Sequence, residues 1–344
     1  MEFCPDYRNV EKAARNIRPD RLPIYEHLIC YETMAELLGR HFYSDDLDEY
    51  YSGYCEFFRK NGYDTVTFEA CITSVMPGNG CLGAHCESSI KTMDDLLKYP
   101  FDEIPEYFFK AYAPHFEALR KAMPAGMKAI GGVGNGIFEC VQDIIGYMNL
   151  CFMSADDPEM YDEVFKRVGQ TNVRIWQRFM KEYGDIFCVL RFGDDLGYKS
   201  NTMLSKTDVC KYIIPQYRQI TDLVHSYGKP FLLHSCGNLF SVMDELICDG
   251  GIDAKHSNED QIAPFSVWTD RYGDRIGNFG GVDTDILCRF DEKQIREYTL
   301  DVLHRCSDKG GVAIGSGNSI PNYVPFSGYM AMVETVREFR GDTK

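Results

Sequence analysis

The sequence predicts an α/β fold, a single (β/α)8 TIM barrel that occupies residues 1–344. Three observations predict this fold. Eight short apolar runs alternate with longer segments whose apolar residues recur at the 3.6-residue period of a helix. No Pro/Gly/Ser-rich linker or low-complexity tract separates the repeats. With 344 residues, of which 44% are hydrophobic and 26% charged, the chain can build one large core.

Eight strands are expected in chain order, each followed by sequence of helical period. They are residues 22–27 (LPIYEH), 64–70 (DTVTFEA), 128–134 (KAIGGVG), 186–193 (IFCVLRFG), 230–236 (PFLLHSC), 252–257 (IDAKHS), 276–283 (IGNFGGVD) and 311–317 (GVAIGSG). The segment of residues 71–127 is longer than a single helical connection between two parallel strands requires. We therefore expect extra helices in the N-terminal part of the chain and a long loop over the barrel mouth.

Several helix ends are visible in the sequence. Ser205, followed three residues later by Asp208, is typical of an N-cap, and Gly228 is expected to end that helix after a bend at Pro215. Asp291 with Gln294 resembles a capping box. The last helix is expected over residues 329–339.

Composition excludes several classes of function. A formal charge of −16, without clusters of Lys and Arg, disfavours binding to nucleic acid or to anionic membranes. The chain has no apolar run of membrane-spanning length, and its charged N-terminus lacks the apolar core of a secretion signal, so we expect a cytoplasmic protein. The fourteen cysteines form no CxxC pair and are expected to be reduced thiols.

A barrel brings the C-terminal ends of its strands to one face, where active sites are built. Polar side chains stand at these expected ends: Glu26, His27, Glu69, Asn135, Asp194, Asp195, His234, Cys236, His256, Asp283 and Asn318. Carboxylates alone would fit any barrel rim. The thiol and imidazoles among them indicate a site with metal-binding chemistry.

The segment FLLHSCGN (231–238) carries the strongest signal for a metal site. Alternation along a strand puts His234 and Cys236 on the same face, and zinc binds both thiolate and neutral imidazole. The alternative is a polar rim with a packed cysteine. His256 is expected to bind metal or contact substrate, against a purely structural hydrogen bond to a rim carboxylate.

Three acids are candidate catalytic residues. Glu69 is expected to be an oxygen ligand or a general acid, unless it is a solvated loop carboxylate. Asp194 and Asp195 cannot both face inward on a regular strand, so one of them is expected to cap a helix or to support a ligand. The candidate substrate-binding residues are His27, Asn135, Asp283 and Asn318.

The run from DDLGYKS (194–200) to LLHSCGN (232–238), followed by GIDAKHSNED and GNFGGVD, resembles the uroporphyrinogen decarboxylase superfamily, and within it the cobamide-dependent methyltransferases. The similarity extends over most of the chain and is strongest over residues 186–340. The resemblance implies a TIM barrel. The methylcobamide:coenzyme M methyltransferases bind zinc through a His-x-Cys pair and a further cysteine near the C-terminus. The resemblance therefore also implies a zinc site of this kind.

His234 and Cys236 match the first two zinc ligands of that pattern, but Asn318 stands where the third, a cysteine, is expected. Asparagine is a poor zinc ligand. Either another group completes the site or metal is not held in this way. The candidates for that group are His256, Glu69 and one of Asp194 and Asp195. His256 is slightly preferred because imidazole suits zinc better than carboxylate.

The resemblance implies a corrinoid-dependent methyltransferase that moves a methyl group between a small methylated substrate or thiol and a corrinoid protein, assisted by zinc. Residues 74–86 are a candidate part of the surface that receives this partner. Two alternatives stay open: a metal-independent decarboxylase and a non-catalytic barrel that binds a corrinoid protein or a ligand. The decarboxylase fits less well, because Glu26 and His27 stand where its arginine-rich turn is expected. A homodimer is left open.

Overall fold

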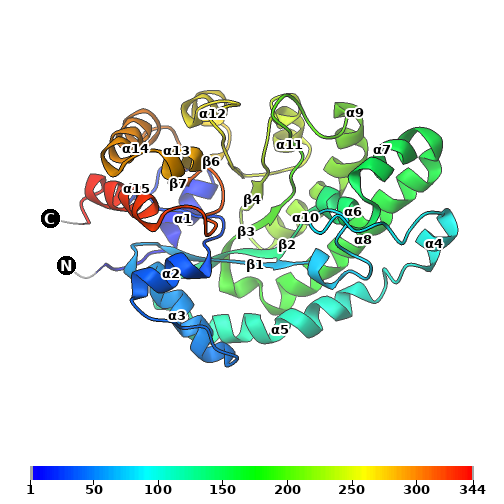
Figure 1. The fold of residues 1–344 in the computed structure, drawn as a ribbon, viewed down its shortest axis with the longest axis horizontal. Coiled ribbons are helices and arrows are strands. Elements are labelled where there is room, and N and C mark those ends of the chain that lie inside the picture. The colour runs from blue at the N-terminus through cyan, green and yellow to red at the C-terminus, as the bar shows by residue number, and fades with distance from the viewer. Residues whose placement is uncertain (1–2, 343–344) are drawn as a thin grey trace.

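The computed structural model describes residues 3–342 and contains, within them, a parallel sheet of seven strands (Figure 1). The sheet curls into a half-barrel, and its spatial order is the order of the chain. The strands are β1 (Thr65–Cys71), β2 (Lys128–Gly134), β3 (Phe187–Gly193), β4 (Phe231–His234), β5 (Ala254–His256), β6 (Gly277–Val282) and β7 (Val312–Ser316). Seven of the eight expected strands are therefore confirmed.

The expected first strand, residues 22–27, was wrong as a strand. This segment makes one isolated parallel bridge, in which Tyr25 N–H donates to the Ile314 carbonyl (3.0 Å) and Ile314 N–H donates to the Pro23 carbonyl (3.0 Å). On its other side the contact with β1 comes from a side chain, since Thr67 Oγ1 donates to the Glu26 carbonyl (2.9 Å). Pro23 has no N–H for a ladder, which limits the segment to a bridge.

Helices surround the sheet and connect its parallel strands. They are α1 (Arg8–Ala14), α2 (Tyr31–Leu38), α3 (Leu47–Lys60), α4 (Met93–Lys98), α5 (Ile104–Ala122), α6 (Ile137–Ile145), α7 (Tyr147–Asp156), α8 (Pro158–Glu182), α9 (Lys206–Asp208), α10 (Ile214–Ser226), α11 (Met243–Cys248), α12 (Phe265–Tyr272), α13 (Thr284–Arg289), α14 (Glu292–Cys306) and α15 (Phe326–Phe339). Short turns of other helix types cover Thr73–Val75, Gly184–Ile186 and Val209–Ile213.

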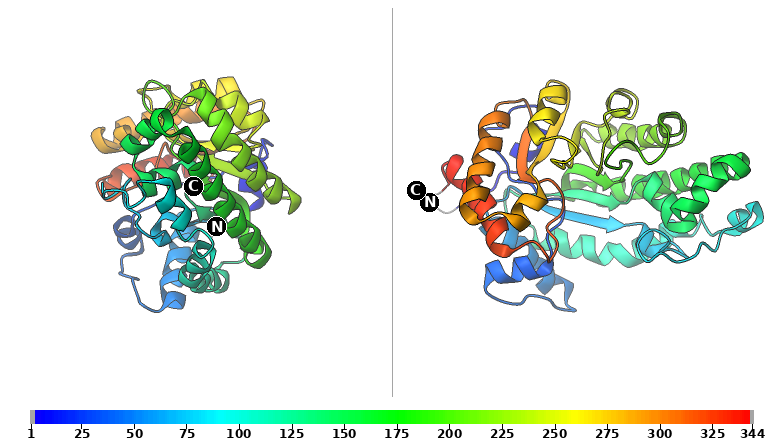
Figure 2. Two further views of the ribbon diagram at one scale, coloured as in Figure 1. Left: turned by 90° about the vertical axis from the view of Figure 1, so that its right-hand side faces the viewer. Right: turned by 45° about the horizontal axis from the view of Figure 1, so that its top comes forward.

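The connections that leave β1 and β2 are the long ones. Helix α4 lies between β1 and its crossover helix α5, and α6 and α7 lie between β2 and the crossover helix α8. These insertions start at the C-terminal ends of the strands, which is where barrel sites form. In Figure 2, α4 and α7 lie at the end of the molecule opposite α15.

The expected helix caps are confirmed, whereas the last helix, α15, begins at Phe326, three residues before the expected start. Ser205 accepts a hydrogen bond from the Asp208 amide (3.1 Å), and Asp291 with Gln294 forms a capping box. A π-helical turn at Val209–Ile213 precedes Pro215, so the irregularity falls just before the proline. All fourteen cysteines are free thiols. No helix within residues 3–342 is both long and apolar enough to cross a membrane.

Candidate functional site

Three imidazoles meet at the C-terminal edge of the sheet. His234 ends β4, His256 ends β5, and the two residues are register partners in the parallel ladder. Their Nδ1 atoms lie 2.7 Å apart. The ring of His27 stacks on His234, with centroids 3.6 Å apart and planes within 10°. All three side chains are buried. The structure brings His234 together with His27, 207 residues before it in the sequence, and with His256, 22 residues after it.

A thiol and a carboxylate lie beside this cluster. Cys236 Sγ is 3.5 Å from His234 Nε2, and Asp195 Oδ1 is 3.9 Å from the same nitrogen. The Cys236 amide donates to Asp195 Oδ1 (2.8 Å), which holds the carboxylate against the turn after β4. Two ligands of a tetrahedral zinc ion lie roughly 3.3–3.8 Å apart, given zinc bonds of about 2.0–2.3 Å. The distances from His234 Nε2 to Cys236 Sγ and to Asp195 Oδ1 are close to this range.

The electrostatics of the site suit a metal more than a free nucleophile. Burial lowers the pKa of His234 well below its usual value, so the ring is neutral and has a lone pair to donate. Burial also raises the pKa of the Cys236 thiol, and the nearby Asp195 raises it further. A thiolate at this position requires a compensating cation.

Asn318 lies at the site. Its Nδ2 is 3.3 Å from Cys236 Sγ, toward which it donates. A donor to sulfur stabilises a thiolate, so the amide supports Cys236 and does not compete for a metal. His256 has partners for both ring nitrogens, because its Nε2 lies 3.1 Å from the Ser316 carbonyl oxygen. Among the candidates for a third ligand, Asp195 has an oxygen within 4.8 Å of the ligand atoms of both His234 and Cys236. His256 instead forms such a cluster with His27 and His234.

Glu69 is paired with a cation that sequence reasoning missed. Arg191, fully buried on β3, places Nη2 2.8 Å and Nε 3.0 Å from Glu69 Oε2. Its Nη1 donates to Tyr25 Oη (2.8 Å) and to the His27 carbonyl (3.1 Å). The signal in the sequence was a lone arginine in the apolar run IFCVLRFG.

The two adjacent aspartates, which directly follow β3, have different surroundings. Asp194 is fully buried and accepts hydrogen bonds from the amides of Phe138 (3.1 Å) and Glu139 (2.8 Å) at the start of α6, and from Tyr217 Oη (2.5 Å). Burial raises its pKa to about 6. Asp194 therefore anchors a helix N-terminus, while Asp195 faces Cys236.

Glu139, on the first turn of α6, was also missed. Its Oε2 accepts a hydrogen bond from Asn135 Nδ2 (2.9 Å), and its Oε1 accepts one from the Asp195 amide (3.3 Å). Burial raises its pKa well above the usual value, and Asp195 and Asp194 raise it further. Asn135 thus contacts the site through Glu139 and adopts a left-handed conformation (φ 63°).

The glycine that ends β3 leaves room between these groups. An ideal Cβ on Gly193 would lie 3.6 Å from His234 Cδ2 and 3.9 Å from both Glu139 Oε2 and Glu69 Oε1. The position is thus surrounded by an imidazole and two carboxyl groups, and it carries no side chain of its own.

Two other residues expected at the barrel rim, Asp283 and Glu26, form hydrogen bonds that stabilise the fold. Asp283 accepts hydrogen bonds from the amides of Asp285 and Asp260 (2.7 Å each), as the N-cap of α13. Glu26 is buried and bonded to Ser316, whose amide donates to Oε1 (3.0 Å). Burial raises the pKa of Glu26 to about 8. Both carboxyl groups are therefore occupied by hydrogen bonds within the protein.

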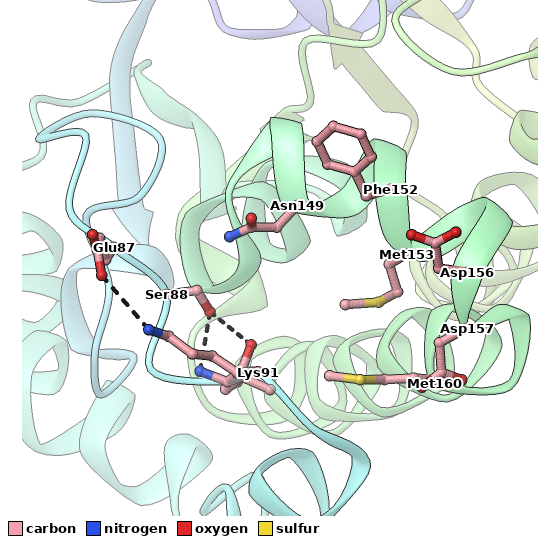
Figure 3. A pocket seen from close by; sticks show the side chains of 10 residues that line it. Glu87, Ser88, Lys91, Asn149, Phe152, Met153, Asp156, Asp157 and Met160 are labelled. Carbon is pink, nitrogen blue, oxygen red and sulfur yellow. Dashed lines mark hydrogen bonds and ion pairs between the residues drawn. The ribbon is translucent and has the colours of Figure 1, made fainter.

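A separate cavity of about 550 Å³ lies between α7 and the segment that precedes α4 (Figure 3). Its lining includes Phe152, Met153 and Met160 together with the acids Glu87, Asp156 and Asp157. None of the residues that line it belongs to the histidine cluster.

A sequence model of the uroporphyrinogen decarboxylase (URO-D) family matches residues 9–339. The chain belongs to the URO-D family. This confirms the superfamily resemblance found in the sequence, and the match covers nearly the whole chain. The TIM-barrel fold of the URO-D family agrees with the curled parallel sheet.

Solved structures agree on the fold of this URO-D family member. A methyltransferase from Methanosarcina mazei superposes with a TM-score of 0.69 at 14% identity, and the match covers 96% of this chain and 98% of that one. A putative vitamin-B12 independent methionine synthase from Listeria monocytogenes gives a TM-score of 0.54 at 9% identity, covering 95% of this chain and 98% of the other. No curated protein sequence is a match.

Proposed function

We propose that this URO-D family protein is a corrinoid-dependent methyltransferase, which moves a methyl group between a small methylated substrate or thiol and a corrinoid on a partner protein. The proposal includes a zinc ion held by His234, Cys236 and Asp195. One observation carries it: an imidazole nitrogen, a sulfur and a carboxylate oxygen of these residues lie within 4.8 Å of one another at the C-terminal ends of the strands.

The donor set suits zinc. Nitrogen, thiolate sulfur and carboxylate oxygen are its usual protein ligands, and three protein ligands leave one position open, as in catalytic zinc sites. Bound there, zinc would supply a Lewis acid that keeps an incoming thiol deprotonated at neutral pH. The chain's own residues prepare the site: Asn318 donates to Cys236 Sγ, and the Cys236 amide holds Asp195 in place.

The alternative decarboxylase finds less support in these residues. A substrate with several carboxylates requires cations with free charge in the cavity. Arg191, a buried cation beside the cluster, is neutralised by Glu69. A second buried cation, Lys255, lies over the Trp268 ring and donates to the Ser257 carbonyl oxygen. The carboxylate of Asp195 would repel such a substrate. Neutral or cationic methyl donors meet no such penalty.

The test is a methyl-transfer assay on the full chain supplied with zinc. The protein is mixed with reduced cobalamin and a panel of methanol, methylamines, methoxyarenes and thioethers, while the cobalt absorption band is followed. The converse assay supplies methylcobalamin and thiols. We expect transfer in one of the two directions. His234→Ala should reduce the rate of transfer at least about 100-fold. The melting temperature should change little, which shows that the loss of activity is not a loss of folding.

His304→Ala is the matched control, because His304 is an exposed histidine on α14. It should leave transfer unchanged. No cobalt change in either direction across the panel, together with release of carbon dioxide from a porphyrinogen or related acid, would establish the decarboxylase in place of the methyltransferase.

A further inference from the structure

The hydrogen bonds around His256 have one consistent direction. Its Nε2 lies 3.1 Å from the Ser316 carbonyl oxygen, and a carbonyl oxygen can only accept, so this nitrogen carries the proton. The ring is fully buried and packs edge-on against Tyr25, with centroids 5.1 Å apart. A second proton would place an unpaired positive charge in the interior beside another imidazole. His256 is therefore neutral, with its lone pair on Nδ1.

That lone pair determines the state of His234. The two Nδ1 atoms are 2.7 Å apart, a distance at which two lone pairs would repel and one proton makes a good hydrogen bond. The proton must then belong to His234 Nδ1. The ring centroids are 4.9 Å apart, compared with 3.6 Å for the stacked His27–His234 pair, as expected for an edge-to-edge contact.

We propose that His256 is a positioning residue, which with the Ser316 carbonyl holds His234 in its Nδ1–H tautomer and directs the Nε2 lone pair toward Cys236 and Asp195. The relay runs from the end of β7 through the end of β5 to the end of β4. The proposal rests on the proposed function only where this lone pair is said to bind zinc. The tautomer itself follows from the hydrogen bonds alone.

Among residues 3–342, His256 is the hydrogen-bond partner recorded for His234 Nδ1. His27 stacks on the face of His234, and the Nδ1 of His27 is buried without a hydrogen-bond partner. On the other side of the ring, His234 Nε2 lies 3.5 Å from Cys236 Sγ. Neutral histidines that bind metal ordinarily donate from the opposite nitrogen to a fixed acceptor, which sets the ring orientation and increases basicity. Here the acceptor is a second histidine.

The decisive measurement is nitrogen-15 NMR of the histidines in the zinc-free full chain near pH 8, with His234 assigned by comparison with His234→Asn. We expect wild-type His234 to show a protonated Nδ1 and an unprotonated Nε2. His256→Gln can still accept from His234 and donate to Ser316, and it should keep this tautomer. His256→Phe removes the acceptor and should give a mixture of tautomers.

Zinc affinity, measured by competition with a chelator, provides the second readout. His256→Phe should weaken it about 10- to 100-fold, the usual cost of losing such a partner, whereas His256→Gln should stay within about threefold. His27→Phe is the control for packing on the ring, and it should leave the tautomer of His234 unchanged. Melting curves establish which variants are folded.

The outcomes separate the relay from the zinc proposal. Wild-type His234 protonated at Nε2 overturns the relay, and this result needs no variant. A folded His256→Phe protein with the wild-type tautomer and wild-type zinc affinity overturns it as well. If wild type binds no zinc but has the Nδ1–H form of His234, the zinc proposal fails and the relay is supported.

Discussion

Glu26 is a buried carboxyl group whose surroundings favour the protonated form. Ser316 Oγ has contacts with both Glu26 Oε2 and the Asn318 carbonyl oxygen (2.5 Å), but one hydroxyl has one proton. A protonated Glu26 can donate to Ser316 Oγ, which leaves the serine proton for the Asn318 carbonyl oxygen. This agrees with the pKa of about 8, which burial produces.

The raised pKa of Glu26 predicts that stability falls as pH rises from about 4.5 through 8. The pKa is about 8 in the folded chain and about 4.5 for an unperturbed glutamate. The folded state therefore binds the proton more tightly. This contribution to the free energy of unfolding is fully present below about pH 4.5 and is lost as pH rises through 8, by a few kcal/mol.

Glu26→Gln should remove this dependence, because an amide can donate to Ser316 Oγ at any pH. Urea denaturation of wild type and variant from pH 6 to pH 9.5 measures the difference. We expect similar stability at pH 6 and a more stable variant at pH 9.5. Parallel pH profiles for the two proteins would mean that Glu26 is ionised in the folded state.

At the scale of elements, the loops after β3 and β4 cross at two glycines. Gly237, directly after Cys236, has φ 86°, and a Cβ there would overlap the backbone of Gly197, with the Gly197 Cα only 2.7 Å away. The Asn238 amide donates to the Tyr198 carbonyl (2.7 Å) at the same crossing. The position of the candidate ligand Cys236 therefore depends on a side chain being absent.

Gly237→Ala should destabilise the protein by about 3 kcal/mol or more and weaken zinc binding, because the backbone of one loop must move. Gly228→Ala is the matched control. Gly228 also has a left-handed conformation (φ 71°), but a Cβ there meets nothing within 4 Å, so the cost should be about 1 kcal/mol.

Urea denaturation and zinc titration of both variants measure these effects. Equal costs for Gly237→Ala and Gly228→Ala, with zinc affinity intact in both, would show that the crossing does not position Cys236.

At the scale of the whole molecule, the proposed zinc site joins the ends of β3 and β4, so zinc binding should stabilise the barrel. Free zinc at 100 times its Kd should add about 2.7 kcal/mol to the free energy of unfolding, since the unfolded chain lacks the assembled site. Thermal melting with zinc and with a chelator tests this. Cys236→Ser should abolish the shift, because a hydroxyl replaces a soft thiolate. An unchanged melting temperature in wild type would contradict the zinc site.

Local patterns in the sequence determined seven strands, the helix caps at Ser205 and Asp291, and the pairing of His234 with Cys236. Each depends on periodicity or spacing over a few residues, and such short-range geometry is set by the chain itself. The resemblance to the URO-D superfamily, carried by the same region, was confirmed. The prediction of a strand at residues 22–27 was wrong, because a strand also needs a neighbouring backbone and free N–H groups. Pro23 has no N–H group to donate.

Only the tertiary structure decided what surrounds the paired histidine and cysteine. Arg191 neutralises Glu69 across 122 residues of sequence, and Glu139 reaches the Asp195 amide across 56. The direction of the hydrogen bonds through His256 depends on the Ser316 carbonyl, 60 residues away. Charge pairing, burial and tautomer are properties of neighbours in space. A single sequence names the residues that carry the chemistry, but folding selects the partners that set their charge and orientation.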